Sequence, residues 1–134
     1  MLKITEIADP NEMEDDLLRV RATGARVARS RQFLARCNDE EAGYLSFDHR
    51  GDIDTGVVYD LFVLPQFRER GIGSQLVVFA EDLARALHCS RTRLSPRAFD
   101  ASVDQTWLEA WYAKKGYCLA TDGTQELEKR IAVP

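Results

Sequence analysis

The chain has 134 residues, of which 45% are hydrophobic and 30% are charged, and its formal net charge at pH 7 is −4. This length predicts a single domain over residues 1–134 with a sizeable core. The acidic balance disfavours nucleic-acid binding, no apolar run is long enough to cross a membrane, and two histidines without a Cys-x-x-Cys pair predict no metal site. The N-terminus lacks a signal-peptide pattern and the three cysteines are scattered, so we expect a cytoplasmic protein with reduced thiols.

The first half of the chain reads as strands with one early helix. Residues 2–7 alternate as a strand does. Asp9 with Glu12 three residues later forms a capping box, which predicts that a helix begins there and carries Met13, Leu17 and Leu18. After it, the pattern predicts strands over 31–37 and 43–48, joined as a hairpin by the turn 38–41.

The second half alternates strands and helices. The predicted elements are a strand over 55–64, a helix over 72–88, a strand over 91–95, a loop over 96–103, a helix over 104–115, and strands over 117–121 and 126–132. This order predicts a mixed α/β sheet with helices on both of its faces.

The junction after the 55–64 strand carries the clearest chemical signal. Pro65 ends an apolar run, and the helical spacing of apolar residues begins at Ile72. Gly71 and Gly73 between them have no Cβ, so a ligand can approach their N–H groups. A helix N-terminus offers unpaired donors and partial positive charge, which suits phosphate. No Lys follows as a Walker A loop requires, and Leu76 stands where a dinucleotide loop needs its third glycine.

Two segments resemble the GCN5-related N-acetyltransferase (GNAT) family. Arg68-x-x-Gly71-x-Gly73, after Leu61-Phe-Val-Leu-Pro65, is similar to its pyrophosphate loop. Tyr112-Ala-Lys-Lys-Gly116-Tyr117 resembles the Tyr…Gly-Phe segment near its C-terminus. The resemblance covers residues 42–132 clearly and the first forty loosely. It implies the GNAT (acyl-CoA N-acyltransferase) fold, a mixed and mostly antiparallel sheet, and transfer of an acetyl group from acetyl-CoA to a primary amine.

The resemblance also implies roles for particular residues in binding acetyl-CoA. The pantetheine arm would pair with the backbone of Phe62, Val63 and Leu64. The pyrophosphate would take backbone amides of the loop and helix start, and Arg68 or Arg70 would add charge. The residues supplying those amides are Glu69, Arg70, Gly71, Ile72, Gly73 and Ser74.

Two residues are implied as catalytic. Tyr112 is the candidate general acid for the departing thiolate, because a phenol with its ordinary pKa of about 10 is protonated at pH 7. The alternative is a packing residue on a helix that already carries two tryptophans. Asp60, a lone carboxylate in an apolar strand, is the candidate base; alternatively it pairs with an arginine, and water takes the proton. Ser95 and Asp100 are weaker candidates.

The segment between the 91–95 strand and Tyr112 departs from the family pattern. It is several residues longer, and Gln105 stands where the family often has Asn. Arg97 and Phe99 in this segment are candidates to line the acceptor pocket. The acceptor itself stays open between a small cationic amine and a protein or peptide amine, and a homodimer is expected. The alternative function is an acyl-CoA-binding regulatory module without turnover.

Overall fold

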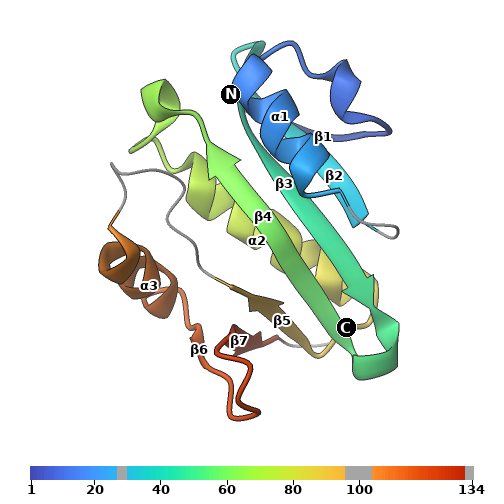
Figure 1. The fold of residues 1–134 in the computed structure, drawn as a ribbon, viewed down its shortest axis with the longest axis vertical. Helices are drawn as coiled ribbons and strands as arrows, with labels where there is room; N and C mark the ends of the chain where they lie inside the picture. Colours follow the sequence, from blue (N-terminus) through green and yellow to red (C-terminus); the bar gives the residue numbers. More distant parts are fainter. Residues whose placement is uncertain (27–29, 96–103, 132–134) are drawn as a thin grey trace.

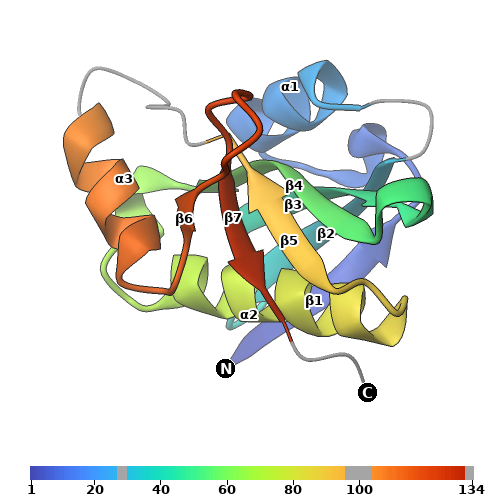
Figure 2. The ribbon, with the colours of Figure 1, turned by 90° about the horizontal axis from the view of Figure 1, so that it is seen from below.

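The computed structural model describes residues 1–26, 30–95 and 104–131, which form a seven-stranded sheet with helices on both faces (Figures 1 and 2). The strands are β1 (Leu2–Ile7), β2 (Ser30–Cys37), β3 (Glu40–Arg50), β4 (Thr55–Val63), β5 (Arg91–Leu94), β6 (Cys118–Leu119) and β7 (Leu127–Arg130). The helices are α1 (Asp16–Gly24), α2 (Ile72–Ala86) and α3 (Gln105–Ala113), with short 3-10 turns η1 (Pro10–Glu12), η2 (Gly51–Ile53) and η3 (Pro65–Phe67). The strand order is β1-β2-β3-β4-β5-β7-β6, in which β4 and β5 are parallel and the other neighbours antiparallel. The predicted fold class, a mixed and mostly antiparallel sheet covered on both faces, is confirmed.

The main core lies between α2 and the middle strands. The buried positions of α2 recur every four residues along one side, at Leu76, Ala80 and Ala84, as the helical spacing of apolar residues predicts. The helix approaches the sheet closely, because a Cβ on Gly56 would lie 2.7 Å from the Phe47 ring and 2.9 Å from the Ala84 side chain. This contact fixes α2, and therefore its N-terminus, against β3 and β4.

The start of the first helix differs from the sequence prediction. The capping box of Asp9 and Glu12 is present, but it closes the 3-10 turn η1, and α1 begins later with Asp15 as its N-cap. The carboxylate of Glu41 accepts hydrogen bonds from the backbone N–H groups of Glu14 (2.9 Å) and Asp15 (2.7 Å). A continuous helix would use these two N–H groups for its own backbone hydrogen bonds. Because they bond to Glu41 on β3 instead, the chain is extended at Met13 before α1 begins.

A bulge bends β4 at the point where the sheet opens. The register between β3 and β4 shifts between Ser46 and Phe47, which leaves Tyr59 as an extra residue in β4. Such a bulge bends its strand and increases the local twist. β5 pairs with β4 only up to Val58. Among the strands that the structure describes, none pairs with residues 59–63 of β4 on that side. Figure 1 shows β4 running on past the end of β5.

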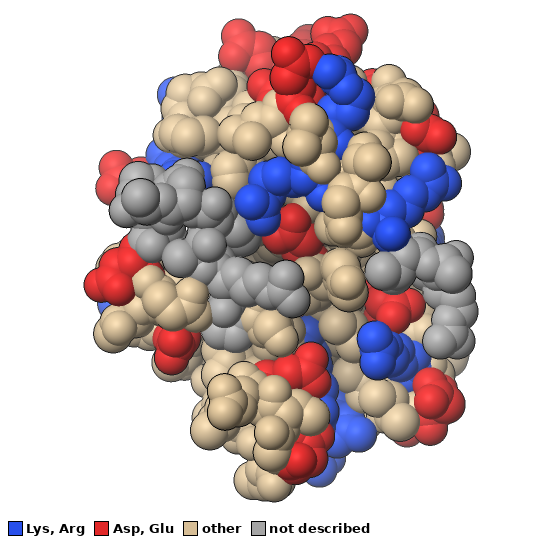
Figure 3. Space-filling view, viewed as in Figure 1, with Lys and Arg blue, Asp and Glu red and all other residues tan. Residues whose placement is uncertain are grey.

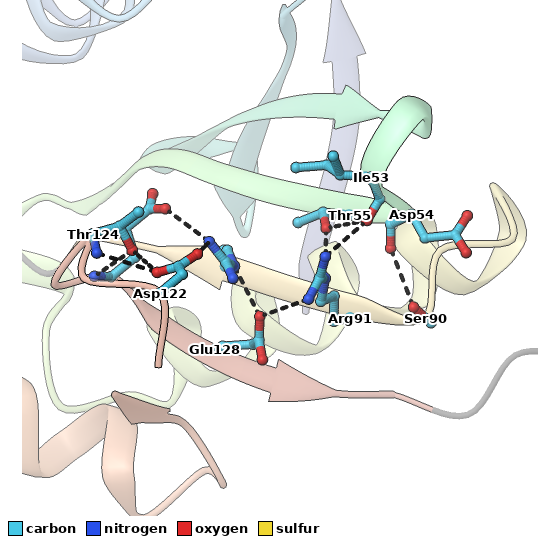
Figure 4. Close-up of polar contacts among 10 residues, drawn as sticks. Ile53, Asp54, Thr55, Ser90, Arg91, Asp122, Thr124 and Glu128 are labelled. Carbon is cyan, nitrogen blue, oxygen red and sulfur yellow. Dashed lines mark hydrogen bonds and ion pairs between the residues drawn. The ribbon is translucent and has the colours of Figure 1, made fainter. Parts of the chain in front are cut away.

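Below the opening, a polar network ties β5 to both neighbours (Figure 4). An oxygen of Glu128 on β7 accepts hydrogen bonds from Arg91 (3.3 Å) and Arg93 (2.8 Å) on β5. Arg91 also donates to the Thr55 hydroxyl on β4 (2.9 Å), and Arg93 forms an ion pair with Asp122 (2.6 Å). These bonds hold the lower half of the sheet together, so the opening is confined to its upper half.

The ends of several elements fall short of their predicted ranges. The last two strands cover 118–119 and 127–130, where the sequence predicts 117–121 and 126–132; residue 132 lies outside the described residues. Helix α2 ends at Ala86, and His88 has the left-handed conformation (φ 63°). The predicted loop 96–103, with the candidates Arg97, Phe99 and Asp100, lies outside the described residues. Of the helices described, none combines the length and apolar character needed to span a membrane.

Candidate active site

The loop between β4 and α2 presents bare backbone amides. Gly71, the N-cap of α2, has a left-handed backbone (φ 79°), and Glu69 shares that conformation (φ 66°). Gly71 has no side chain with which to cap the helix, and the first intrahelical bond at this end is from the Gln75 N–H to the Gly71 carbonyl (3.1 Å). The amides of residues 72–74 therefore have no acceptor within the helix, as at any helix start. They form a positive, donor-rich end suited to an anion.

These amides open into a cleft of about 850 Å³ between the end of β4, the start of α2 and the inner side of α3. Of the predicted cofactor residues, the lining includes Val63, Arg68, Glu69, Gly71, Ile72, Gly73 and Ser74. The predicted catalytic Tyr112 also lines it. The structure thus brings together the two sequence segments that carry the family resemblance, 68–74 and 112–117.

The open edge of β4 is formed by alternate residues. The N–H of Leu64 donates to the Ala42 carbonyl (2.8 Å), so this residue is bonded toward β3. Successive residues of a strand direct their backbone groups to opposite edges. Phe62, two residues before Leu64, therefore also directs its backbone groups toward β3. Leu61 and Val63 face the open side. Of the three residues predicted to pair with pantetheine, only Val63 presents its backbone to the cleft, and Leu61 joins it.

The two predicted arginines of the loop pack against aromatic rings. Arg68 donates through Nε to the Val63 carbonyl (3.0 Å), and its guanidinium lies 5.3 Å from the centre of the Phe62 ring. Arg70 is exposed, and its guanidinium lies 5.0 Å from the centre of the Phe67 ring. Arg68 lines the cleft and Arg70 does not.

The Tyr112 side chain is buried on α3 with its ring edge-on to the rings of Trp111 (4.9 Å between centroids) and Tyr117 (5.8 Å). Burial raises the pKa of the Tyr112 phenol, and the negative charge of Asp60 raises it further. The hydroxyl is therefore protonated at neutral pH. It forms no hydrogen bond with any residue that the structure describes, so its proton is available to a ligand in the cleft.

Asp60 is not the isolated carboxylate that the sequence suggests. It accepts hydrogen bonds from Arg21 on α1 (2.9 and 3.0 Å), from the Tyr44 hydroxyl, and from the N–H of Leu61 (3.0 Å). Its side chain is 17% exposed and that of Arg21 is 23% exposed. The predicted alternative, pairing with an arginine, is the arrangement that the structure contains.

The charges on the surface are mixed. On the face of the molecule seen in Figure 3, acidic and basic side chains are interspersed, without a large area of one sign.

The sequence analysis did not name several residues that line the cleft, most of them on α3 or at its N-cap. Trp107, Leu108, Trp111 and the N-cap Asp104 line the cleft beside Leu61. Lys115, which follows α3, donates to the Ser74 hydroxyl (2.7 Å) and lies 4.2 Å from the centre of the Trp111 ring. The amphipathic pattern of residues 107–117 predicts the helix, but it does not show that α2 lies opposite.

Comparison with known proteins identifies the family. The model of the acetyltransferase (GNAT) domain matches residues 28–118, which is more than half of the chain. No curated protein matches the chain. A GNAT family acetyltransferase from Elizabethkingia anophelis, solved with acetyl-CoA bound, has a TM-score of 0.75 at 16% identity, covering 97% of this chain and 98% of its own.

Two further solved structures share the fold. An IAA acetyltransferase from Bacillus cereus has a TM-score of 0.74 at 15% identity, covering 98% of this chain and 100% of its own. The ribosomal-protein-S18-alanine N-acetyltransferase from Escherichia coli has a TM-score of 0.72 at 17% identity, covering 100% and 96% respectively. Such identities establish a common fold, while the domain match establishes the family: the chain belongs to the GNAT acetyltransferases.

Proposed function

We propose that this protein is an N-acetyltransferase that moves an acetyl group from acetyl-CoA to a primary amine. The observation that carries the proposal is the cleft in which three features meet. These are the open edge of β4, the bare amides at the start of α2, and the buried hydroxyl of Tyr112. The edge of β4 suits the pantetheine arm of an acyl-CoA thioester, the amides suit its diphosphate, and the Tyr112 hydroxyl suits its departing sulfur.

The residues present fit the donor. The amides of Ile72, Gly73 and Ser74 suit its diphosphate, because a helix N-terminus combines donors with positive charge. The Val63 N–H, directed away from β3, suits the pantetheine arm or the thioester oxygen, whose developing charge a fixed donor stabilises. The relative from Elizabethkingia anophelis was solved with acetyl-CoA bound, which supports the same donor here.

In the proposed reaction the amine nitrogen attacks the thioester carbonyl, the new C–N bond forms and the C–S bond breaks. The Tyr112 hydroxyl gives its proton to the departing sulfur as a general acid and is reprotonated from solvent. The attacking amine loses its proton to water. Three donors already bind the Asp60 carboxylate. We therefore assign Asp60 the role of holding β4 and acting through its charge, rather than that of a base.

The acceptor is proposed as a primary amine, either a small cationic amine or an amine of a protein or peptide. One relative of the same fold is named for acetylating an alanine of a ribosomal protein, which supports an amine acceptor. The slightly acidic net charge of −4 favours cationic partners.

Thiol release from acetyl-CoA in the presence of a panel of amines tests the proposal. The panel contains spermidine, lysine and a peptide with an N-terminal alanine. We expect at least one amine to raise thiol release well above hydrolysis, with the acetylated product visible by mass spectrometry. Tight binding of acetyl-CoA without turnover on any amine would favour instead a regulatory module that binds acyl-CoA.

A further inference from the structure

A buried polar network surrounds the hydroxyl of Tyr117, in the segment between α3 and β6. The Tyr117 residue is 2% exposed, and its hydroxyl donates to the Glu81 carboxylate on α2 (3.0 Å). A second bond joins this hydroxyl to that of Thr92 on β5 (2.8 Å). Because a carboxylate can only accept, the Tyr117 proton is directed to Glu81 and the Thr92 hydroxyl is the donor of the second bond. The two bonds hold the Tyr117 ring between α2 and β5.

Glu81 is in turn held from the sheet. It lies on the buried side of α2 and is 4% exposed. Lys129 on β7 donates to both oxygens of its carboxylate (3.2 and 3.1 Å). The stem of Lys129 lies against Gly116, where a Cβ would be 3.4 Å from the lysine Cε. The network thus joins α2, β5 and β7 around one phenol, and Figure 2 shows the segment that follows α3 beside α2.

Stability alone does not account for this network. A largely buried ion pair adds little stability over well-packed apolar side chains of similar volume. A phenylalanine at residue 117 would also keep the buried ring and need no polar partner. What a fully bonded polar network supplies is one fixed arrangement of the side chains that it contains.

Tyr117 is the residue through which this fixed arrangement reaches Tyr112. Its N–H donates to the Tyr112 carbonyl (3.2 Å), and the two rings meet edge-on with their centroids 5.8 Å apart. The Tyr112 hydroxyl bonds to no residue that the structure describes, so packing sets the direction of its ring. The other aromatic neighbour, Trp111, is only partly buried and lines the cleft. A general acid has to lie within hydrogen-bond reach of the atom that it protonates, so the direction of the Tyr112 ring matters for catalysis.

We propose that Glu81 and Tyr117 are positioning residues for Tyr112. This inference rests on the proposed function and extends it. With the network intact, the Tyr117 ring keeps the Tyr112 hydroxyl directed into the cleft. Without it, the Tyr112 ring takes several orientations, and its hydroxyl reaches the departing sulfur in only a fraction of the complexes. The kcat then falls, while the affinity for acetyl-CoA stays the same.

A double-mutant cycle in kcat tests whether Tyr117 acts through Tyr112, with the amine that turns over fastest as acceptor. Tyr117→Phe keeps the ring and removes the bonds. We expect kcat to fall about tenfold, because a small misplacement of a catalytic group has a large effect on rate, with the acetyl-CoA affinity unchanged. On the Tyr112→Phe background the same change should lower kcat less than about twofold, since no hydroxyl is left to position. Equal losses on the two backgrounds would overturn the proposal.

Thr55→Val is the matched control for lost stability. The Thr55 hydroxyl is also buried and bonded twice, to the Ile53 carbonyl (2.8 Å) and to Arg91 (2.9 Å), but it lies at the other end of β4. Both Thr55→Val and Tyr117→Phe should lower the unfolding temperature by roughly 3–10 °C. Only Tyr117→Phe should lower kcat. The same loss of kcat in the control would make the effect one of general stability and would overturn the proposal.

A ligand-free NMR spectrum tests the positioning without turnover. The ring carbons of the four tyrosines are labelled with ¹³C, and the Tyr112 signal is identified by its loss in Tyr112→Phe. The described bonds of Glu81 go to Tyr117 and Lys129. Glu81→Leu should therefore shift or broaden the Tyr112 signal through Tyr117. Glu81→Gln, whose amide oxygen still accepts from Tyr117, should keep the wild-type signal and most of the kcat, and Thr55→Val should leave the signal unchanged.

The two readouts distinguish failure of this inference from failure of the proposed function. A Tyr112 signal that is indifferent to Glu81→Leu would overturn the proposal, whatever the turnover. Turnover by the wild type with an unchanged kcat in Tyr117→Phe and Glu81→Leu would overturn the positioning role and leave the proposed function standing. A wild type that acetylates no amine would contradict the proposed function, and the spectrum would then still decide whether the network fixes the Tyr112 ring.

Discussion

The indole of Trp111 lies against Gly73, where a Cβ would be 3.4 Å from two carbons of the ring. This contact joins α3 to the bare start of α2 and closes one side of the cleft. It links the two sequence segments on which the family resemblance rests, and it explains why a glycine suits position 73 although no positive φ is required there.

A larger side chain at residue 73 should therefore damage the donor site without unfolding the protein. In Gly73→Val the branched side chain would displace the Trp111 ring and cover the amides of the helix start. We expect acetyl-CoA to bind at least about tenfold more weakly by calorimetry, equivalent to about 1.4 kcal/mol. Gly24→Val is the matched control, because a Cβ on Gly24 meets no atom within 4 Å. Equal affinities in the two variants would contradict the assignment of the cleft.

Gly71 should be sensitive for a different reason. A Cβ there would meet nothing within 4 Å, but the backbone has φ 79°, a conformation that costs an L-residue roughly 1–2 kcal/mol. We expect Gly71→Ala to lower the free energy of unfolding by roughly that amount in a urea titration. Gly24→Ala, with open space and no positive φ, should be neutral or stabilising. A neutral Gly71→Ala would mean that the loop is not held in the left-handed conformation.

Tyr112→Phe should lower kcat and leave donor binding intact. The substitution removes only a hydroxyl that bonds to no described residue, so we expect an unchanged unfolding temperature and acetyl-CoA affinity. The loss of a general acid should lower kcat by roughly 10²-fold. Because burial and the charge of Asp60 raise the Tyr112 pKa, the wild-type kcat should show no loss from Tyr112 ionisation as the pH rises to about 10. A Phe variant with wild-type kcat would show that the hydroxyl only packs.

The pair of Asp60 and Arg21 should contribute to stability as a unit. Removing one partner leaves the other charge partly buried and unpaired, which costs roughly 3–5 kcal/mol for fully buried pairs and less here, at 17% and 23% exposure. In a double-mutant cycle by urea unfolding, Asp60→Asn with Arg21→Met should cost less than the sum of the two single changes. Additive losses would mean that the two charges do not interact appreciably.

The sequence predicts those parts of the fold that depend on local patterns. The apolar stripe of α2 and the hairpin turn at Asn38 and Asp39 are encoded within a few residues, and both turn residues have positive φ. The predicted start of the first helix was wrong because the contact that decides it comes from Glu41 on β3, which is distant in sequence. The partner of Asp60 could be named only as some arginine, because Arg21 lies 39 residues away.

The residues of the donor site illustrate the same limit. Phe62, Val63 and Leu64 are adjacent in sequence, but which of them faces the cleft is set by the pairing of β4 with β3 and by the bulge at Tyr59. Lys115 carries the ordinary signal of a lysine near a helix C-terminus, where it favours the dipole of its own helix. Only the structure shows that its ammonium also donates to Ser74, at the N-terminal end of α2.

Thermal unfolding with and without acetyl-CoA tests the central claim most directly, with AMP as the control for nonspecific nucleotide binding. Acetyl-CoA at about 100 times its dissociation constant should add roughly 2.7 kcal/mol to the stability of the folded state. For a domain of this size we predict that the unfolding temperature rises by roughly 6–14 °C, while AMP at the same concentration produces a much smaller shift. No shift at millimolar acetyl-CoA would contradict the account, leaving a GNAT fold that does not bind the donor.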